Sequence, residues 1–267
     1  MHRALGLSVV GVLLAVTGCS PEDGTSTKSQ VPPSSPTSTP NRQTTPSRTP
    51  TSSPTPTLSP SPGVLPAPEK VRVRHRGIDA SHHQGAIDWQ AVADDGVSFA
   101  YLKATEGTTY TDPTFAAHRA EAQDLGIDVG GYHYFQLCSS GADQAGHFAS
   151  VLGKLGAGDL PPAIDLELAG SCPTPPPRDV LLAEVRTFLR QVEAATEREP
   201  VVYLYPELEE QYDFAGALGD YRQWVRSLDG RPTRDWWIWQ QTDSGSVEGI
   251  AGPVDVNVMW SHEVRRR

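Results

Sequence analysis

The chain has 267 residues, including 24 prolines and 24 glycines, and a formal net charge of -10 at pH 7, which is enough for one sizeable core plus appendages. Residues 1–70 hold 5 of the 22 basic and 3 of the 32 acidic side chains, so the rest of the chain is at -12. This acidic balance argues against nucleic acid as a partner and against capture of an anionic polymer by long-range attraction.

The N-terminus has the layout of an export signal. Residues 1–18 contain Arg3, an apolar run through Val16 and small residues just before Cys19, and the run is too short for a confident membrane span. The ending "VTGC" resembles a bacterial lipobox, which predicts cleavage before Cys19 and lipidation of that cysteine. The product would be a lipoprotein anchored on the outer face of a bacterial membrane, facing the cell wall. An ordinary signal peptide with an incidental cysteine is the alternative.

Residues 19–70 are rich in Pro, Ser and Thr and almost free of large apolar side chains. Such a segment buries too little surface to offset its ordering entropy, so we expect a disordered linker. In a polyproline-like conformation about 50 residues reach at most roughly 150 Å. The remaining domain, residues 71–267, contains Cys138 and Cys172, which are candidates for a disulfide in an exported protein, although sequence leaves their proximity open.

Apolar runs and amphipathic stretches alternate along this domain. The predicted strands are residues 98–104, 127–135, 161–168, 201–205, 236–242 and 254–259. The predicted helices are residues 112–126, 142–156 and 178–197. Strand followed by helix, repeated, indicates a parallel sheet, which could close as a barrel or stay open. No glycine-rich dinucleotide fingerprint follows any strand. The late strands have little helix between them, so a barrel of about 197 residues would lack some outer helices.

Polar side chains cluster where the predicted strands end. Asp165 and Glu167 lie two positions apart in "PPAIDLEL" and therefore share one face of a strand. In a parallel barrel the carboxyl ends of the strands form one face, where Asp79 and Asp255 would join this pair. Candidates for contacting a substrate on the same face are Glu106, Tyr132, His133, Tyr203, Tyr205, Trp239, Gln240 and Asn257.

Convergent acids suggest acid/base chemistry on a glycosidic bond, because protonating the leaving oxygen near neutral pH needs a carboxylic acid with a raised pKa. Tyrosines and tryptophans around the acids offer flat surfaces on which a sugar stacks. Simpler roles remain open: Glu106 could pair with Lys103, and His133 could be a core histidine. Adjacent His82 and His83 are not spaced to ligate a metal, and no metal is predicted.

Six segments resemble, in this order, successive motifs of the glycoside hydrolase family 25 muramidases, the Chalaropsis-type lysozymes. They are "GIDASHHQGAIDW", "FAYLKATEGTTYTDPTF", "GGYHYF", "QAGHF", "LPPAIDLEL" and "IWQQTDSGSVEGIAGPVDVN", within about residues 76–258. The resemblance implies an α/β fold, an irregular, TIM-barrel-like β/α barrel with five β/α units followed by strands lacking helices. It also implies an N-acetylmuramidase that needs no cofactor and cleaves the β-1,4 bond between N-acetylmuramic acid and N-acetylglucosamine in peptidoglycan.

Position by position, the resemblance assigns the proposed general acid to Glu167. Asp165 matches the acid beside it, thought to tune Glu167 or to orient the acetamido group of the substrate. Asp79 and Asp255 match acids that line the family's cleft.

Two positions depart from the family pattern. Ala80 stands where Val is usual, and Gln241 where an aromatic residue is common, which would weaken one stacking contact. The sequence thus predicts an exported, monomeric peptidoglycan hydrolase, active in wall remodelling or bacteriolysis. The rival interpretations are a wall-binding barrel that no longer cuts, and a hydrolase of another glycan such as chitin.

Overall fold

The computed structural model describes residues 70–264, and these belong to one compact unit. The predicted signal, Cys19 and almost all of the predicted linker lie outside the described residues. Every helix within residues 70–264 is too short or too polar to span a membrane.

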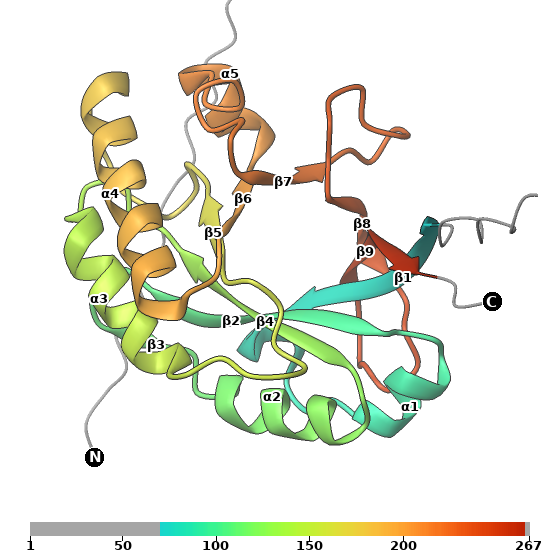
Figure 1. Cartoon of the computed structure of the whole chain (residues 1–267). Coiled ribbons are helices and arrows are strands. Elements are labelled where there is room, and N and C mark those ends of the chain that lie inside the picture. The colour runs from blue at the N-terminus through green and yellow to red at the C-terminus, as the bar shows by residue number, and fades with distance from the viewer. Residues whose placement is uncertain (1–69, 265–267) are drawn as a thin grey trace, which may run out of the picture. The chain divides into compact units, whose positions relative to one another are not determined.

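Eight strands close into a barrel (Figure 1). The first seven strands around the barrel are parallel to one another. The eighth strand runs antiparallel to both of its neighbours and closes the ring. In order around the barrel they are β1 (Lys70–Ala80), β2 (Phe99–Glu106), β4 (Asp128–Tyr134), β5 (Ala163–Leu166), β6 (Val201–Leu204), β7 (Arg222–Arg226), β8 (Ile238–Gly245) and β9 (Val254–Val264). The short β3 (Tyr110–Thr111) pairs only with the end of β2.

Five strands are followed by a helix. In chain order the helices are α1 (Trp89–Asp94), α2 (Phe115–Asp124), α3 (Gly141–Leu152), α4 (Arg178–Thr196) and α5 (Pro206–Tyr212). They follow β1, the β2–β3 pair, β4, β5 and β6, whereas β7, β8 and β9 succeed one another without an intervening α-helix in the described chain. The predicted architecture of five β/α units followed by strands lacking helices is confirmed.

All six predicted strands and all three predicted helices are present, with bounds shifted by a few residues. Sequence periodicity missed α1, α5 and the strands β1, β3 and β7. The two helices are only 6 and 7 residues long, and β7, "RQWVR", mixes charged and apolar residues without a continuous apolar run. The end of β5 at Leu166 places Glu167 just beyond the strand, at the mouth of the barrel.

The barrel interior is packed with side chains and forms a floor beneath its carboxyl end. Its buried apolar members are Phe99, Tyr101, Ala163, Val201, Tyr203, Trp224, Ile238 and Met259. Glycines opposite two of the rings make room for them: a Cβ on Gly77 would lie 2.3 Å from the Phe99 ring, and one on Gly130 would lie 2.3 Å from the Tyr101 ring. A second, larger core fills the space between the strands and the helices.

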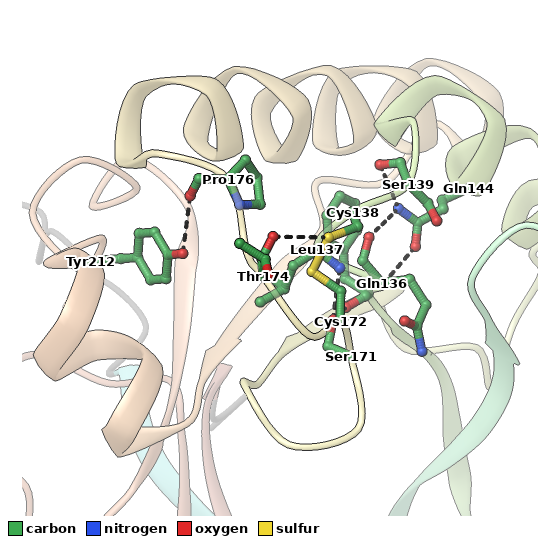
Figure 2. Close-up of a disulfide and its surroundings, with 11 residues drawn as sticks. Gln136, Leu137, Cys138, Ser139, Gln144, Ser171, Cys172, Thr174, Pro176 and Tyr212 are labelled. Carbon is green, nitrogen blue, oxygen red and sulfur yellow. Dashed lines mark hydrogen bonds between the residues drawn. A yellow bond between two sulfur atoms is a disulfide. The ribbon is translucent and has the colours of Figure 1, made fainter.

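Cys138 and Cys172 are joined in a disulfide, with their Cα atoms 5.8 Å apart (Figure 2). The bond links the loop that follows β4 to the loop that follows β5. Beside it, the backbone N–H of Leu137 donates to Ser171 Oγ (2.7 Å), and that hydroxyl donates to the carbonyl of Phe135 (3.2 Å). Because these loops begin directly after Tyr134 and Leu166, and Glu167 is the first residue of the second loop, the crosslink fixes one rim of the barrel mouth.

Candidate active site

A cleft of about 290 Å³ opens at the carboxyl ends of the barrel strands. Its most distinctive members are four acids contributed by three strand ends: Asp79 from β1, Asp165 and Glu167 from β5, and Asp255 from β9. Asp79 and Asp255 are opposite each other in the β1–β9 register. The sequence-based expectation that these four residues converge therefore agrees with their placement in the cleft.

The four acids form two hydrogen-bonded pairs, Asp79 with Asp255 and Asp165 with Glu167. The pair on β5 shares a face because strand side chains alternate. Asp165 is the more enclosed of the two, since its Oδ1 is sealed from solvent and has no hydrogen-bond partner among the described residues. Two carboxyls in contact cannot both ionise easily, so each pair favours holding a proton.

Burial raises the pKa of Glu167 from its ordinary value of 4.5 to about 7. A hydrogen bond from Asp165 and the positive charge of Arg226 act in the opposite direction and limit this rise. Burial, followed by the charges of Glu167 and Asp79, raises the pKa of Asp165 well above its ordinary range. The β5 pair therefore keeps a proton available near neutral pH, in the range that suits a general acid.

The second acid pair rests on a buried amide. Burial, and then the charge of Asp255, raises the pKa of Asp79 well above its ordinary range, and burial also raises that of Asp255. Asn257, fully buried beneath them, donates from Nδ2 to Asp79 Oδ2 (2.7 Å) and accepts from Trp224 Nε1 (2.8 Å). The sequence had suggested that Asn257 lines the cleft. Asn257 instead lies below the cleft, where it orients Asp79.

Tyrosines form the walls of the cleft. Tyr132, Tyr134, Tyr203 and Tyr205 all line it. The hydroxyl of Tyr203 donates to Gln240 Oε1 at 2.9 Å, which ties β6 to β8 inside the barrel. Flat rings with polar edges around a set of acids suit a sugar, whose apolar face stacks on the ring while its hydroxyls hydrogen-bond to polar neighbours.

Two cations accompany the acids. The guanidinium of Arg226 lies 5.0 Å from the centre of the Tyr205 ring and pairs with Asp243 (Nη2 to Oδ2, 2.5 Å). Lys103 Nζ lies 4.8 Å from the centre of the Tyr134 ring. Both side chains line the cleft, so the site combines carboxyls, aromatic walls and fixed positive charge.

The comparison with protein families bears on this arrangement directly. The model of a family described as "Glycosyl hydrolases family 25" matches residues 78–250, the segment from the first strand of the barrel to the turn before β9. The chain belongs to glycosyl hydrolase family 25. It is therefore a glycoside hydrolase.

Individual relatives agree with the family assignment. The chain is 36% identical over 191 residues to YegX of Escherichia coli K12, covering 68% of each protein. It is 34% identical over 197 residues to Lysozyme M1 of Streptomyces globisporus, covering 68% of this chain and 66% of that protein. A family 25 glycosyl hydrolase structure from Bacillus anthracis superposes with a TM-score of 0.64 at 29% identity, covering 69% of this chain and 88% of that one.

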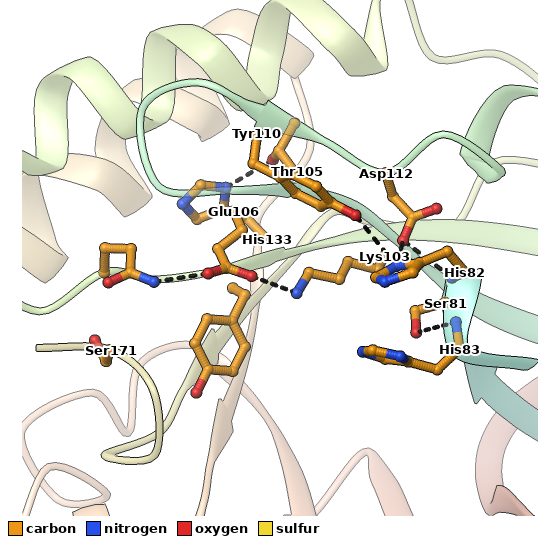
Figure 3. A network of polar contacts seen from close by, with 12 residues as sticks. Ser81, His82, His83, Lys103, Thr105, Glu106, Tyr110, Asp112, His133 and Ser171 are labelled. Atoms are coloured by element: carbon orange, nitrogen blue, oxygen red, sulfur yellow. Dashed lines mark hydrogen bonds and ion pairs between the residues drawn. The ribbon is translucent and has the colours of Figure 1, made fainter. Parts of the chain in front are cut away.

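A polar network beside the cleft of this family 25 barrel explains the place of Glu106 (Figure 3). Glu106 does not line the cleft, contrary to expectation. Its carboxylate accepts from Lys103 Nζ (2.6 Å) and from Gln136 Nε2 (2.8 Å). Glu106 therefore fixes the ammonium group that does reach the cleft. In the same network, Asp112 accepts from the backbone N–H of His82 (3.0 Å) and lies 2.7 Å from its Nδ1.

His133 and Trp239 are not among the residues that line the cleft, contrary to the expectation that they lie on the substrate-binding face. His133 is fully buried between Thr105 Oγ1 (2.7 Å) and Gln144 Oε1 (3.1 Å), and burial lowers its pKa to about 3. Trp239 donates to the carbonyl of Ser227 (2.9 Å) on the outer side of β8. Their sequence neighbours Tyr132, Tyr134 and Gln240 line the cleft. Because side chains alternate between the two faces of a strand, His133 and Trp239 face away from the cleft.

Sequence reasoning also missed part of the hydrolase cleft. Lining residues outside the predicted set of substrate contacts are Ser81, His83, Lys103, Tyr134, Trp224, Arg226 and Asp243. Lys103 and Tyr134 belong to the polar residues that the sequence placed near the ends of β2 and β4, whereas Trp224 and Arg226 lie on the strand that was not predicted. Gln241, the departure from the family pattern, is not among the lining residues, and its Oε1 accepts from Arg74 at 3.4 Å.

Proposed function

We propose that this glycoside hydrolase is a peptidoglycan hydrolase, an N-acetylmuramidase that cleaves the β-1,4 bond between N-acetylmuramic acid and N-acetylglucosamine. The observation that carries the proposal is the enclosed acid pair of Asp165 and Glu167, both with raised pKa values, in a tyrosine-walled cleft. The similarity to proteins named as lysozymes supports the choice of peptidoglycan as substrate.

Glu167 is the general acid of this proposal. It is the less enclosed member of its pair, and its pKa of about 7 lets it hold a proton at neutral pH and still release it to the glycosidic oxygen. Asp165, more deeply enclosed, keeps its own proton and donates a hydrogen bond to the Glu167 carboxylate that forms. This stabilises the ionised state at the moment when Glu167 gives up its proton.

Asp79 and Asp255 act on the other side of the reaction. When the leaving group departs, positive charge develops on the sugar ring. An acid pair that shares one proton retains one negative charge, which stabilises this centre electrostatically. The bond from Asn257 holds Asp79 in place, so its carboxylate needs no reorganisation during the reaction.

The cellular setting of the proposal comes from the N-terminal sequence and from the wall-acting names of the relatives. We propose an exported protein whose lipidated Cys19 anchors it on the outer face of a bacterial membrane. Residues 19–70 then act as a linker to a monomeric catalytic domain of residues 71–267. Because the domain is acidic, tethering rather than long-range attraction supplies its proximity to the wall.

The proposal predicts the identity of the new chain ends. Incubating the full chain with purified peptidoglycan should release fragments whose new reducing ends, identified by mass spectrometry, are N-acetylmuramic acid. Chitin oligomers should be cut far more slowly under the same conditions. Reducing ends of N-acetylglucosamine, or faster cleavage of chitin, would contradict the proposed bond. Binding without any new ends would indicate the non-catalytic barrel instead.

A further inference from the structure

A second groove lies at the end of the barrel opposite the catalytic cleft. The β1–β9 register pairs Asp79 with Asp255 at the cleft and Arg74 with Trp260 five positions further along both strands, which corresponds to roughly 17 Å. These two strands lie side by side at the edge where the barrel closes (Figure 1). The groove measures about 600 Å³, larger than the cleft at about 290 Å³.

Three of the six tryptophans of the chain, Trp236, Trp237 and Trp260, line this tryptophan groove. All three are partly exposed. The ring centroids of Trp236 and Trp260 are 6.4 Å apart. Partly exposed tryptophans gathered in one concave surface are typical of an interaction site, and they provide the stacking surface that a sugar ring requires.

Arginines hold these rings and add positive charge. The guanidinium of Arg72 lies 4.7 Å from the centre of the Trp260 ring, and that of Arg222 lies 4.8 Å from the centre of the Trp237 ring. Both arginines line the groove, and neither forms an ion pair with another described residue. Asp235 also lines the groove, so the charges of its lining sum to +1 on a domain of strongly negative net charge.

Two polar atoms of groove residues lack partners among residues 70–264. Trp260 Nε1, a donor, and Gln223 Oε1, an acceptor, are both buried without a hydrogen bond. Unpaired buried donors and acceptors are unfavourable. Gln223 is held by hydrogen bonds from its Nε2 to the carbonyls of Leu218 (2.9 Å) and Tyr221 (3.1 Å), which leave its Oε1 unused. The lining of the groove therefore holds unused hydrogen-bonding capacity beside its aromatic surface.

We propose that the tryptophan groove is a second, non-catalytic binding site for a carboxylate-bearing glycan, the peptidoglycan strand itself. The tryptophans stack on sugar rings, the arginines pair with carboxylates of the lactyl groups or stem peptides, and the orphaned polar atoms meet acetamido groups or hydroxyls. The identity of the glycan rests on the proposed function. Because peptidoglycan is a crosslinked mesh, one strand held at this groove raises the effective concentration of neighbouring strands at the cleft.

The test uses the full chain carrying Glu167→Gln, so that peptidoglycan is bound without being cut. Cosedimentation with insoluble peptidoglycan should weaken about five-fold on adding Trp236→Ala, which removes a stacking surface, or Arg222→Glu, which reverses a charge. Arg190→Glu, an exposed charge reversal on α4 outside the groove, is the matched control and should bind as the parent does. Equal binding by parent and groove variants overturns the proposal.

A second readout separates the groove from the cleft. In the active chain, Trp236→Ala and Arg222→Glu should leave turnover of a short soluble glycan unchanged, because such a substrate reaches only the cleft. A parallel fall in that turnover would assign both residues a structural role and overturn the proposal. If the active chain releases no muramic acid ends but the groove variants still lose binding, the proposed function fails and the groove assignment stands.

Discussion

Replacing Glu167 with Gln is expected to lower kcat on peptidoglycan about 10³-fold, because the leaving oxygen loses its proton donor. Gln has nearly the same shape and can still hydrogen-bond to Asp165, so substrate binding should change little. The measurement is the initial rate of reducing-end release, together with the affinity for a soluble glycan. Glu210→Gln, at an exposed position of α5, is the matched control and should retain the parent rate.

A substrate with an activated phenolate leaving group sharpens this prediction. Such a group departs without protonation, so the loss caused by Glu167→Gln should be much smaller than on peptidoglycan. An equal loss on both substrates would mean that Glu167 acts by positioning or binding. An unchanged rate on peptidoglycan would remove Glu167 from the mechanism altogether.

The same substitution is expected to stabilise the fold above neutral pH. The pKa of Glu167 is higher in the folded protein, about 7, than the 4.5 of an ordinary Glu, so the native state binds the proton more tightly than the unfolded state. The stabilising contribution of this proton is complete below pH 4.5 and is lost as pH rises to about 7. Above that pH the buried carboxylate is unfavourable in the native state, and Gln removes that cost.

The size of the effect follows from the shift in pKa. It corresponds to at most about 3 kcal/mol, and about 2 kcal/mol after allowance for the partial access of water. Glu167→Gln should therefore raise Tm by about 4–8 °C at pH 8 and leave it nearly unchanged at pH 4. Thermal unfolding at the two pH values tests this, with Glu210→Gln as control. A stabilisation at pH 4 that equals the one at pH 8 would contradict the assigned proton.

Sequence patterns predicted the parts of the fold that repeat. The long helix α4 has apolar residues at helical spacing, and the strand β6 is a short apolar run. The alternation of strands and helices along the chain indicates parallel pairing of the strands. Closure of the barrel depends on the pairing of β1 with β9, which are far apart in sequence and antiparallel. No local pattern specifies such a contact, and the resemblance to family 25 supplied it.

The candidate site was predicted correctly where the alternation of side chains between the two faces of a strand was taken into account. Asp165 and Glu167 were assigned to one face because they are two positions apart, and the structure places both in the cleft. The same rule, applied to "GGYHYF", would have kept Tyr132 and Tyr134 and removed His133. Arg226 could not be predicted from the sequence, because its strand β7 forms by pairing with β6 and β8 and has no strand pattern of its own.

The most direct test of the account is a pH titration of the Glu167 side chain. Carbon-13 NMR of the protein labelled at Glu carboxyls would follow its signal, assigned by its absence in Glu167→Gln. We expect a midpoint at about pH 7, with the shift caused by burial. A midpoint near 4.5, the ordinary value for Glu, would leave Glu167 ionised at neutral pH and would contradict its role as the general acid.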